Sequence, residues 1–213
     1  MTIPEILLWG GTGQARVLHE LIGDRYRIAA VVDRALDRSP FDQAPLLRHE
    51  GDVEHWLASR GDAPLVAAVA IGGGHGAERR RLAGWLNARG VATPTLIHGT
   101  AVIASNSHVG DGCQILAGAI VAAGVRLGSS VIINTGAQVD HDSSVGDGSH
   151  IGPGAVTAGE ISIGEDVFVG TGAIIMPRVS IGRGATIGAG AVVVSNVAPG
   201  ATVVGCPARP ISK

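Results

Sequence analysis

The chain has 213 residues, of which 46% are apolar, so it is long enough for one large domain or two small ones with a sizeable core. Its formal net charge of −2 gives no broad basic field to collect phosphates, which argues against nucleic acid as a partner. Aromatic residues are only 3% whereas glycines number 33, so we expect a core of small and β-branched side chains in repeated units.

Localisation and redox state can be predicted from the same composition. No apolar run approaches the roughly 20 residues that span a bilayer, and the N-terminus MTIPEILLWGG carries no cationic leader. We therefore expect a cytoplasmic protein without membrane insertion. The two cysteines, Cys113 and Cys206, provide neither a disulfide framework nor a zinc cluster, so we expect both to be reduced and structural, and no metal to be bound.

The first 95 residues alternate between strand and helix patterns, which predicts a small parallel α/β sheet. We expect the run Arg79–Arg81 to be a solvated face of the last helix. The predicted elements, in chain order, are a strand, glycine turn and helix at 5–22, a strand ending in an acid at 27–34, a helix at 52–60, a strand at 64–74, and a helix at 77–90 that Gly90 stops.

The glycine turn at 10–13 follows a strand and opens a helix, so its backbone N–H groups can face a phosphate. Asp33 closes the next strand, where a carboxylate commonly meets a ribose hydroxyl. A dinucleotide site is the alternative, but Arg16 interrupts the G-x-G-x-x-G pattern, so a mononucleotide or nucleotide-sugar fits better. The glycines could also serve only a tight turn. A second turn, IGGG at 71–74, is expected at the same sheet edge and predicts a shared crevice.

A six-residue period begins at Ile97 and continues without slippage to Val193. Sixteen of its seventeen positions are aliphatic, Thr157 being the exception, and the fourth residue after each is small or β-branched. This period predicts a parallel β-helix in which each hexad is a short strand and a turn, with the aliphatic side chain pointing inward. Thr157 marks an expected irregularity. We place the domain boundary near Pro94, giving domains 1–95 and 96–213.

The segment NTGAQVDHDSSVGDGSH at 134–150 contains His141 between Asp140 and Asp142. A solvated turn is the simplest interpretation of such a cluster. The repeat adds information, because His141 lies two positions after the inner residue Val139 and therefore projects outward. An imidazole held on a rigid coil beside carboxylates suits a general base, with Asp142, or alternatively Asp140, fixing its tautomer.

A short α/β domain, an uninterrupted hexapeptide β-helix, INTGAQVDHD…SHIG in the middle coils and VGCPAR near the end together resemble the sialic-acid O-acetyltransferase and bacillosamine N-acetyltransferase family. The resemblance covers nearly the whole chain. It implies a Rossmann-like N-terminal domain, a left-handed parallel β-helix and a homotrimer. It also implies transfer of acetyl from acetyl-CoA to the 4-amino group of a nucleotide-linked 4-amino-4,6-dideoxysugar, such as GDP-perosamine.

The resemblance assigns roles by motif. It makes His141 the catalytic base, Asp142 and Asp140 its flanking acids, and Asn134 a sugar contact. It places His150 in the acetyl-CoA site, with the Gly159 amide donating to the thioester oxygen. Residues along the later coils where the CoA arm would run are Thr171, Gly188 and Ala189. Residues of the nucleotide-sugar crevice are Gly11, Thr12, Gly13, Asp33, Arg34 and Gly73. A departure is Gln14, where many relatives carry histidine.

Several alternatives belong to other functional classes. Sugar O-acetylation of the sialic-acid type would use the same base. A non-catalytic nucleotide-sugar-binding trimer would keep the repeat but would not need His141. A zinc enzyme of the carbonic-anhydrase type needs three convergent histidines, and the histidines of the repeat region show no close pair: His98, His108, His141 and His150. An NAD-dependent enzyme is a further alternative. The sugar and the nucleotide, whether GDP, UDP or dTDP, stay open.

Overall fold

The computed structural model describes residues 3–61 and 63–211. The chain divides into an α/β unit, Met1–Ile71 with Leu82–Pro94, and a β-helix unit, Gly72–Arg81 with Thr95–Lys213. The segment 72–81 departs from the expected division near residue 95. It joins the β-helix unit because its arginine side chains form hydrogen bonds with backbone carbonyls and a carboxylate of the coils.

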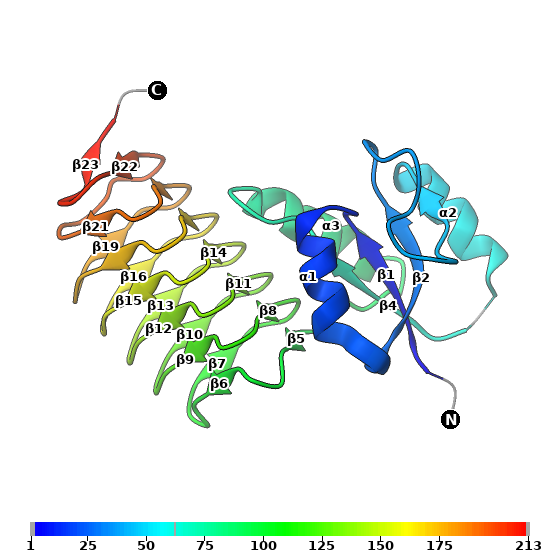
Figure 1. The fold of residues 1–213 in the computed structure, drawn as a ribbon, viewed down its shortest axis with the longest axis horizontal. Coiled ribbons are helices and arrows are strands. Elements are labelled where there is room, and N and C mark those ends of the chain that lie inside the picture. The colour runs from blue at the N-terminus through cyan, green and yellow to red at the C-terminus, as the bar shows by residue number, and fades with distance from the viewer. Residues whose placement is uncertain (1–2, 62, 212–213) are drawn as a thin grey trace. The chain divides into compact units, whose positions relative to one another are not determined.

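The α/β unit contains a four-stranded parallel sheet in the order β3-β2-β1-β4 (Figure 1). The central strands are apolar on both faces, as expected for strands buried between other elements; Leu7, Ala30 and Ala67 are fully buried. The first elements of the chain are β1 (Glu5–Trp9), α1 (Gly13–Ile22), the 3₁₀ turn η1 (Gly23–Arg25), β2 (Arg27–Val32), β3 (Leu46–Leu47), α2 (Glu50–Ser59), β4 (Leu65–Val69) and α3 (Gly76–Asn87).

The predicted strands and helices of this region are confirmed, with small differences. β3 and η1 are too short to leave a periodic pattern and were not predicted. The helix α3 ends at Asn87, and Gly90 follows it with φ of 77°, a left-handed conformation that glycine adopts without strain. No helix in the described ranges is long and apolar enough to cross a membrane.

The repeat region forms a parallel β-helix built from three sheets (Figure 1). We name each sheet by a central strand: the β12 sheet (β21-β18-β15-β12-β9-β6), the β13 sheet (β19-β16-β13-β10-β7) and the β14 sheet (β23-β22-β20-β17-β14-β11-β8-β5). Paired residues such as Ile133 and Ile151 are 18 positions apart, so one coil contains three hexads. Strands β22 and β23 are the antiparallel pair that ends the β14 sheet.

The strands of this unit are nearly all two residues long, one pointing inward and one outward. Their bounds are β5 (Leu96–Ile97), β6 (Val102–Ile103), β7 (His108–Val109), β8 (Gln114–Ile115), β9 (Ile120–Val121), β10 (Arg126–Leu127), β11 (Ile132–Ile133), β12 (Gln138–Val139), β13 (Ser144–Val145), β14 (His150–Ile151), β15 (Val156–Thr157), β16 (Ser162–Ile163), β17 (Phe168–Val169), β18 (Ile174–Ile175), β19 (Ser180–Ile181), β20 (Thr186–Ile187), β21 (Val192–Val193), β22 (Thr202–Val204) and β23 (Arg209–Pro210).

The predicted inner rows form the core of the β-helix. From Cys113 to Val197, both the aliphatic positions and the fourth residues after them are buried. Ile97 in the first coil is 39% exposed. Thr157 is buried within the row, and its hydroxyl accepts a hydrogen bond from the Asp140 N–H at 3.3 Å. The polar inner residue is therefore satisfied by the turn that carries His141.

The two cysteines are free thiols. Cys113 is fully buried in the inner row, and its thiol lies 3.1 Å from the Gly128 carbonyl oxygen. Burial raises the pKa of Cys113 to about 12, so the nucleophilic thiolate is scarce at neutral pH. Cys206 is exposed.

Candidate functional site

The turn after β12 places His141 on the outside of the coil, with 52% of its side chain exposed. Its Nδ1 lies 3.0 Å from Asp142 Oδ2, while Asp140 Oδ1 accepts the His141 backbone N–H at 2.7 Å. Asp142 has φ of 54°, in the left-handed region that aspartate tolerates better than most residues. Asp142 therefore contacts the imidazole, and Asp140 fixes the backbone that carries it.

The two carboxylates make the His141 imidazole a stronger base. The hydrogen bond that His141 donates to Asp142, and then the charge of Asp140, raise the pKa of His141 above its ordinary value. When the ring is neutral, an Nδ1–H that donates to Asp142 leaves the lone pair on Nε2. A histidine whose Nδ1 is bonded to an acid and whose Nε2 is unprotonated has the arrangement of a general base.

Gly159 occupies the same turn one coil further along and lies against the His141 ring. A Cβ placed on Gly159 would be 2.5 Å from His141 Nε2, so any larger residue would have to move the imidazole. The next residue, Glu160, donates its backbone N–H to the His141 carbonyl at 2.9 Å. The Gly159 N–H has no hydrogen-bond partner within the part of the chain that the structure describes.

His150 has the opposite environment, because it points outward from β14 but is only 4% exposed. The Gly73 N–H donates to its Nδ1 at 2.8 Å, and its Nε2 lies 2.9 Å from the side-chain amide of Asn134. Phe168 contacts the ring edge to face, with centroids 5.4 Å apart. Burial, followed by the charge of Arg79, lowers the pKa of His150 to about 4, so the ring is neutral at neutral pH.

The expected site residues of the β-helix unit fall into three groups. His141, its two aspartates and Gly159 share the edge after the β12 sheet. Asn134 and His150 meet on the outer face of the β14 sheet. The residues expected to follow the CoA arm lie on or beside the edge after that sheet, Thr171 and Ala189 being exposed and Gly188 partly exposed. One chain therefore does not gather all of its predicted catalytic and acetyl-CoA residues on one edge.

In the α/β unit, the Asp33 carboxylate binds a backbone N–H group of the glycine turn. Asp33 accepts the N–H of Gly11 through Oδ2 at 2.9 Å and the N–H of Ala35 through Oδ1 at 2.9 Å. The expectation that the Gly11 N–H faces a phosphate is therefore not supported, since Asp33 already accepts it. Gly10 has φ of 111°, and a Cβ there would overlap the Ala70 carbonyl. These two glycines serve the tight turn.

The start of α1 stays open to solvent. Thr12, the N-cap residue, is exposed and makes no side-chain hydrogen bond to the helix, and Gly13 has open space around it. Arg34 is also exposed. Gly73, expected in the same crevice, instead belongs to the β-helix unit, where His150 accepts its N–H. Among the nucleotide-binding candidates at the carboxyl edge of the sheet, Thr12 and Arg34 are thus exposed and Gly13 is open, while Gly11 and Asp33 are bonded to each other and stay predictions.

The prediction of a solvated arginine face was wrong for two of its three residues. Arg79 is 1% exposed, and Arg80 is bonded to Asp166, with its Nη2 2.6 Å from Oδ2. Arg81 is exposed and pairs with Glu78 at 2.8 Å. Consecutive arginines near a helix start carry no signal of burial, because the coil surface that buries them is distant in sequence.

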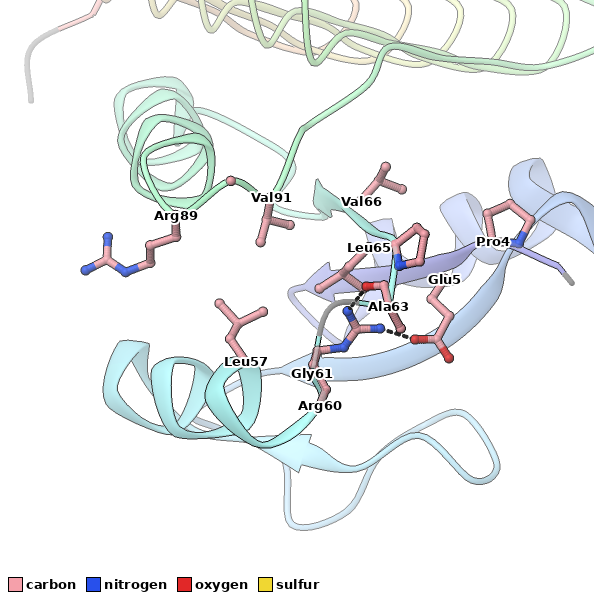
Figure 2. Close-up of a pocket in the computed structure, with 12 residues that line it drawn as sticks. Pro4, Glu5, Leu57, Arg60, Gly61, Ala63, Leu65, Val66, Arg89 and Val91 are labelled. Carbon is pink, nitrogen blue, oxygen red and sulfur yellow. Dashed lines mark hydrogen bonds and ion pairs between the residues drawn. The ribbon is translucent and has the colours of Figure 1, made fainter.

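A cavity of about 460 Å³ lies elsewhere in the α/β unit (Figure 2). It is lined by Glu5 and Leu65, which begin β1 and β4, and by Arg60, whose guanidinium bonds both the Glu5 carboxylate and the Ala63 carbonyl. Ligands of open parallel sheets bind at the carboxyl ends of strands, whereas this cavity is at the amino ends. Within residues 3–61 and 63–211, no three His, Cys, Asp or Glu residues are placed to hold a metal ion.

Comparison with known proteins places these features in a family. Residues 160–195 match the model of the bacterial transferase hexapeptide (six repeats). PerB from Caulobacter crescentus, solved in complex with CoA and GDP-perosamine, is 32% identical, with a TM-score of 0.87 over 99% of both chains. The acetyltransferase domain of PglB from Neisseria gonorrhoeae FA1090, in complex with acetyl coenzyme A, is 32% identical with a TM-score of 0.87 over 99% of this chain and 100% of that chain.

A further solved relative is a histidine-to-asparagine mutant of perosamine N-acetyltransferase from Caulobacter crescentus, in complex with CoA and GDP-perosamine. It is 31% identical, with a TM-score of 0.88 over 100% of this chain and 99% of that chain. A comparison with curated protein sequences finds no match. The full-length likeness, the hexapeptide β-helix and the acid-flanked histidine agree, and the chain belongs to the sialic-acid O-acetyltransferase and bacillosamine N-acetyltransferase family of hexapeptide-repeat acyltransferases.

Proposed function

We propose that the protein transfers the acetyl group of acetyl-CoA to the 4-amino group of a nucleotide-linked 4-amino-4,6-dideoxysugar, GDP-perosamine or a close analogue. The observation that carries this proposal is the geometry of His141, an exposed imidazole with Nδ1 on Asp142 and Nε2 facing Gly159. The proposal is also supported by the full-length similarity of the chain to a protein solved in complex with CoA and GDP-perosamine.

In this mechanism the amine nitrogen attacks the thioester carbonyl carbon, so a C–N bond forms as the C–S bond breaks. Nε2 of His141 takes a proton from the nitrogen, and the resulting imidazolium is stabilised by Asp142. The proton then becomes available to the departing CoA thiolate. The unpaired N–H of Gly159 is our candidate donor to the oxyanion that develops on the thioester oxygen. No covalent acyl-enzyme is required.

We assign the α/β unit to the nucleotide-sugar and the β-helix unit to acetyl-CoA and catalysis. The strand order β3-β2-β1-β4 with a glycine turn after β1 supports our assignment of a Rossmann-like fold to this unit. Thr12 and Gly13 lie at the N-terminus of α1, where the helix dipole favours an anion. Family membership supports left-handed winding of the β-helix and a cytoplasmic location.

A homotrimer explains the outer surface of the β12 sheet. Its outward residues are apolar except Gln138, and Val102 is 59%, Val156 37% and Ile174 44% exposed. The outward ladder of the β13 sheet is polar by contrast: Arg126, Ser144, Ser162 and Ser180. His141 lies at the edge of the apolar face. Packing this face against a second copy would cover it and bring the neighbour's acetyl-CoA residues toward His141. Light scattering that finds a monomer at micromolar concentration would contradict this arrangement.

The decisive experiment measures thiol release from acetyl-CoA with a panel of GDP-, UDP- and dTDP-linked 4-amino sugars and their 4-hydroxy counterparts. We expect release with a 4-amino sugar, and mass spectrometry with base treatment should show an amide in the product. Release only with hydroxy sugars would assign the protein to O-acetylation of the sialic-acid type. Binding of the nucleotide-sugars without any thiol release would identify a non-catalytic binding protein.

A further inference from the structure

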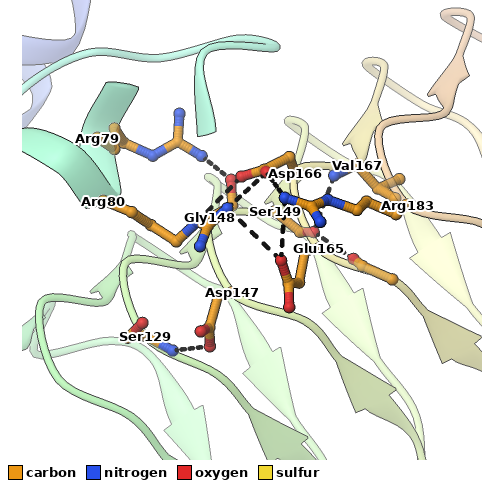
Figure 3. A network of polar contacts seen from close by, with 11 residues as sticks. Arg79, Arg80, Ser129, Asp147, Gly148, Ser149, Glu165, Asp166, Val167 and Arg183 are labelled. Atoms are coloured by element: carbon orange, nitrogen blue, oxygen red, sulfur yellow. Dashed lines mark hydrogen bonds and ion pairs between the residues drawn. The ribbon is translucent and has the colours of Figure 1, made fainter. Parts of the chain in front are cut away.

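Two arginines of α3 connect the segment 72–81 to the β-helix (Figure 3). Arg79 donates from Nε to the Ser130 carbonyl at 3.3 Å, from Nη1 to the Gly73 carbonyl at 3.4 Å, and from Nη2 to the Gly148 carbonyl. Arg80 binds both carboxylate oxygens of Asp166, at 3.1 and 2.6 Å. A side chain as polar as Arg79 is rarely buried unless several acceptors compensate for its lost hydration.

The acceptors belong to three successive coils. Ser130, Gly148 and Asp166 are spaced by 18 residues, so they are equivalent positions of one edge of the β-helix. Gly76, the first residue of α3, approaches this edge so closely that a Cβ would overlap the Gly148 carbonyl. The arginine pair and the glycine together fix the register of the segment on the coils.

Gly73 connects Arg79 to His150 through two backbone hydrogen bonds. The Gly73 carbonyl accepts from Arg79, and the Gly73 N–H donates to His150 Nδ1 at 2.8 Å. A backbone N–H can only donate, so Nδ1 must be the unprotonated nitrogen and a neutral ring carries its proton on Nε2. Asn134, the expected sugar contact, has its Nδ2 placed 2.9 Å from this nitrogen and its Oδ1 on the Thr135 N–H. An Nε2–H needs an acceptor, so this tautomer requires the Asn134 amide to turn its Oδ1 toward the ring.

We propose that Arg79 is a positioning residue for acetyl transfer, which holds the Gly73 loop and thereby sets His150 as a neutral imidazole protonated on Nε2. The role given to His150 and Asn134 at the substrate rests on the proposed function. Gly73, Asn134 and Phe168, which contact the ring, carry no charge, and Arg79 is the charged group that acts on it. Although burial lowers the pKa of Arg79 to about 10, it stays protonated at neutral pH and opposes protonation of His150.

The test measures the tautomer and the pKa of His150 in the full-length protein. Long-range ¹H–¹⁵N NMR of the imidazole reports both. In the wild type we expect the Nε2–H form only, with no protonation until the pH falls to about 4. In Arg79→Met, loss of the charge should raise the pKa of His150, and loss of the Gly73 contact should produce a mixture of tautomers. Arg79→Lys should keep the low pKa but not the single tautomer. The control is Arg81→Met, an exposed neighbour, which should change neither.

Kinetics give a second readout. Arg79→Met should lower kcat/KM for acetyl transfer between about 10- and 100-fold, the range expected when reacting groups are misplaced by about 1 Å. A folded Arg79→Met variant with the wild-type tautomer and titration of His150 would overturn the proposal. If that variant does not fold, the wild-type spectrum still decides, because an Nδ1–H tautomer would overturn the proposal directly. The spectra do not depend on turnover, so a wild type that releases no thiol would refute the proposed function alone.

Discussion

His141 and His150 are nine residues apart in the same coil, but the protein gives them opposite chemistry. His141 is half exposed, and two carboxylates raise its pKa, whereas His150 is buried beside a cationic arginine and its pKa falls to about 4. The comparison shows that environment, and not residue type, divides the roles of base and neutral hydrogen-bonding partner. The predictions below alter that difference, beginning with the largest expected effect.

The scaffold that separates the two histidines depends on its dry interior. Val145→Asp places an unpaired carboxylate in the inner row, at a cost of several kcal/mol, so we expect the chain to unfold. The matched control is Ser144→Asp, because this adjacent residue points outward and is exposed. Circular dichroism and thermal melting measure both variants. If Val145→Asp is as stable as the parent, the register of the repeat is wrong.

Removing the base should abolish most turnover without changing the fold. His141→Asn keeps a polar group at an exposed position and opens no cavity, so we expect kcat to fall by about 10²- to 10⁴-fold while both ligands still bind. His108→Asn, at another exposed histidine of the coils, should keep full activity. Steady-state kinetics with isothermal titration of each ligand separates these effects. Full activity in His141→Asn would assign the base to another group.

The exposed histidine also needs space beside it. Gly159→Ala introduces a methyl group 2.5 Å from His141 Nε2, so the imidazole must move. We expect a loss of kcat between about 10- and 100-fold with little change in melting temperature. Gly99→Ala is the control, since this glycine is exposed with open space around it. Equal activities of the two alanine variants would show that Gly159 does not set the position of the base.

The smallest expected effect concerns the acid that distinguishes His141 from His150. Asp142 raises the pKa of His141, so Asp142→Asn should lower it and move the acid limb of the rate profile to lower pH. The base must be neutral to work, and hence the variant keeps activity further into acid. At neutral pH the rate should fall less than about ten-fold, because exposed charge pairs are weak. Asp140→Asn should shift the limb less, and the reverse order would exchange their roles.

The sequence predicts the β-helix well because its rule is local. Each hexad repeats the same inward residue, so the buried rows and the outward position of His141 follow from counting. The irregularity expected at Thr157 is absent, because Thr157 is buried in the regular register of the row and its hydroxyl accepts from Asp140. The surroundings of His150 are different, because Gly73 and Arg79 reach it from a distant helix start. No short-range pattern encodes that packing, and the arginine run was therefore assigned to solvent.

The central claim is that His141 is the base of acetyl transfer, and the pH dependence of kcat/KM for the nucleotide-linked aminosugar tests it most directly. We predict that the wild-type profile falls in acid through an ionisation above the ordinary histidine pKa, and that this limb is absent in His141→Asn, where only the amine of the substrate titrates. An acid limb of the same position and depth in both proteins would contradict the assignment of His141 as the base.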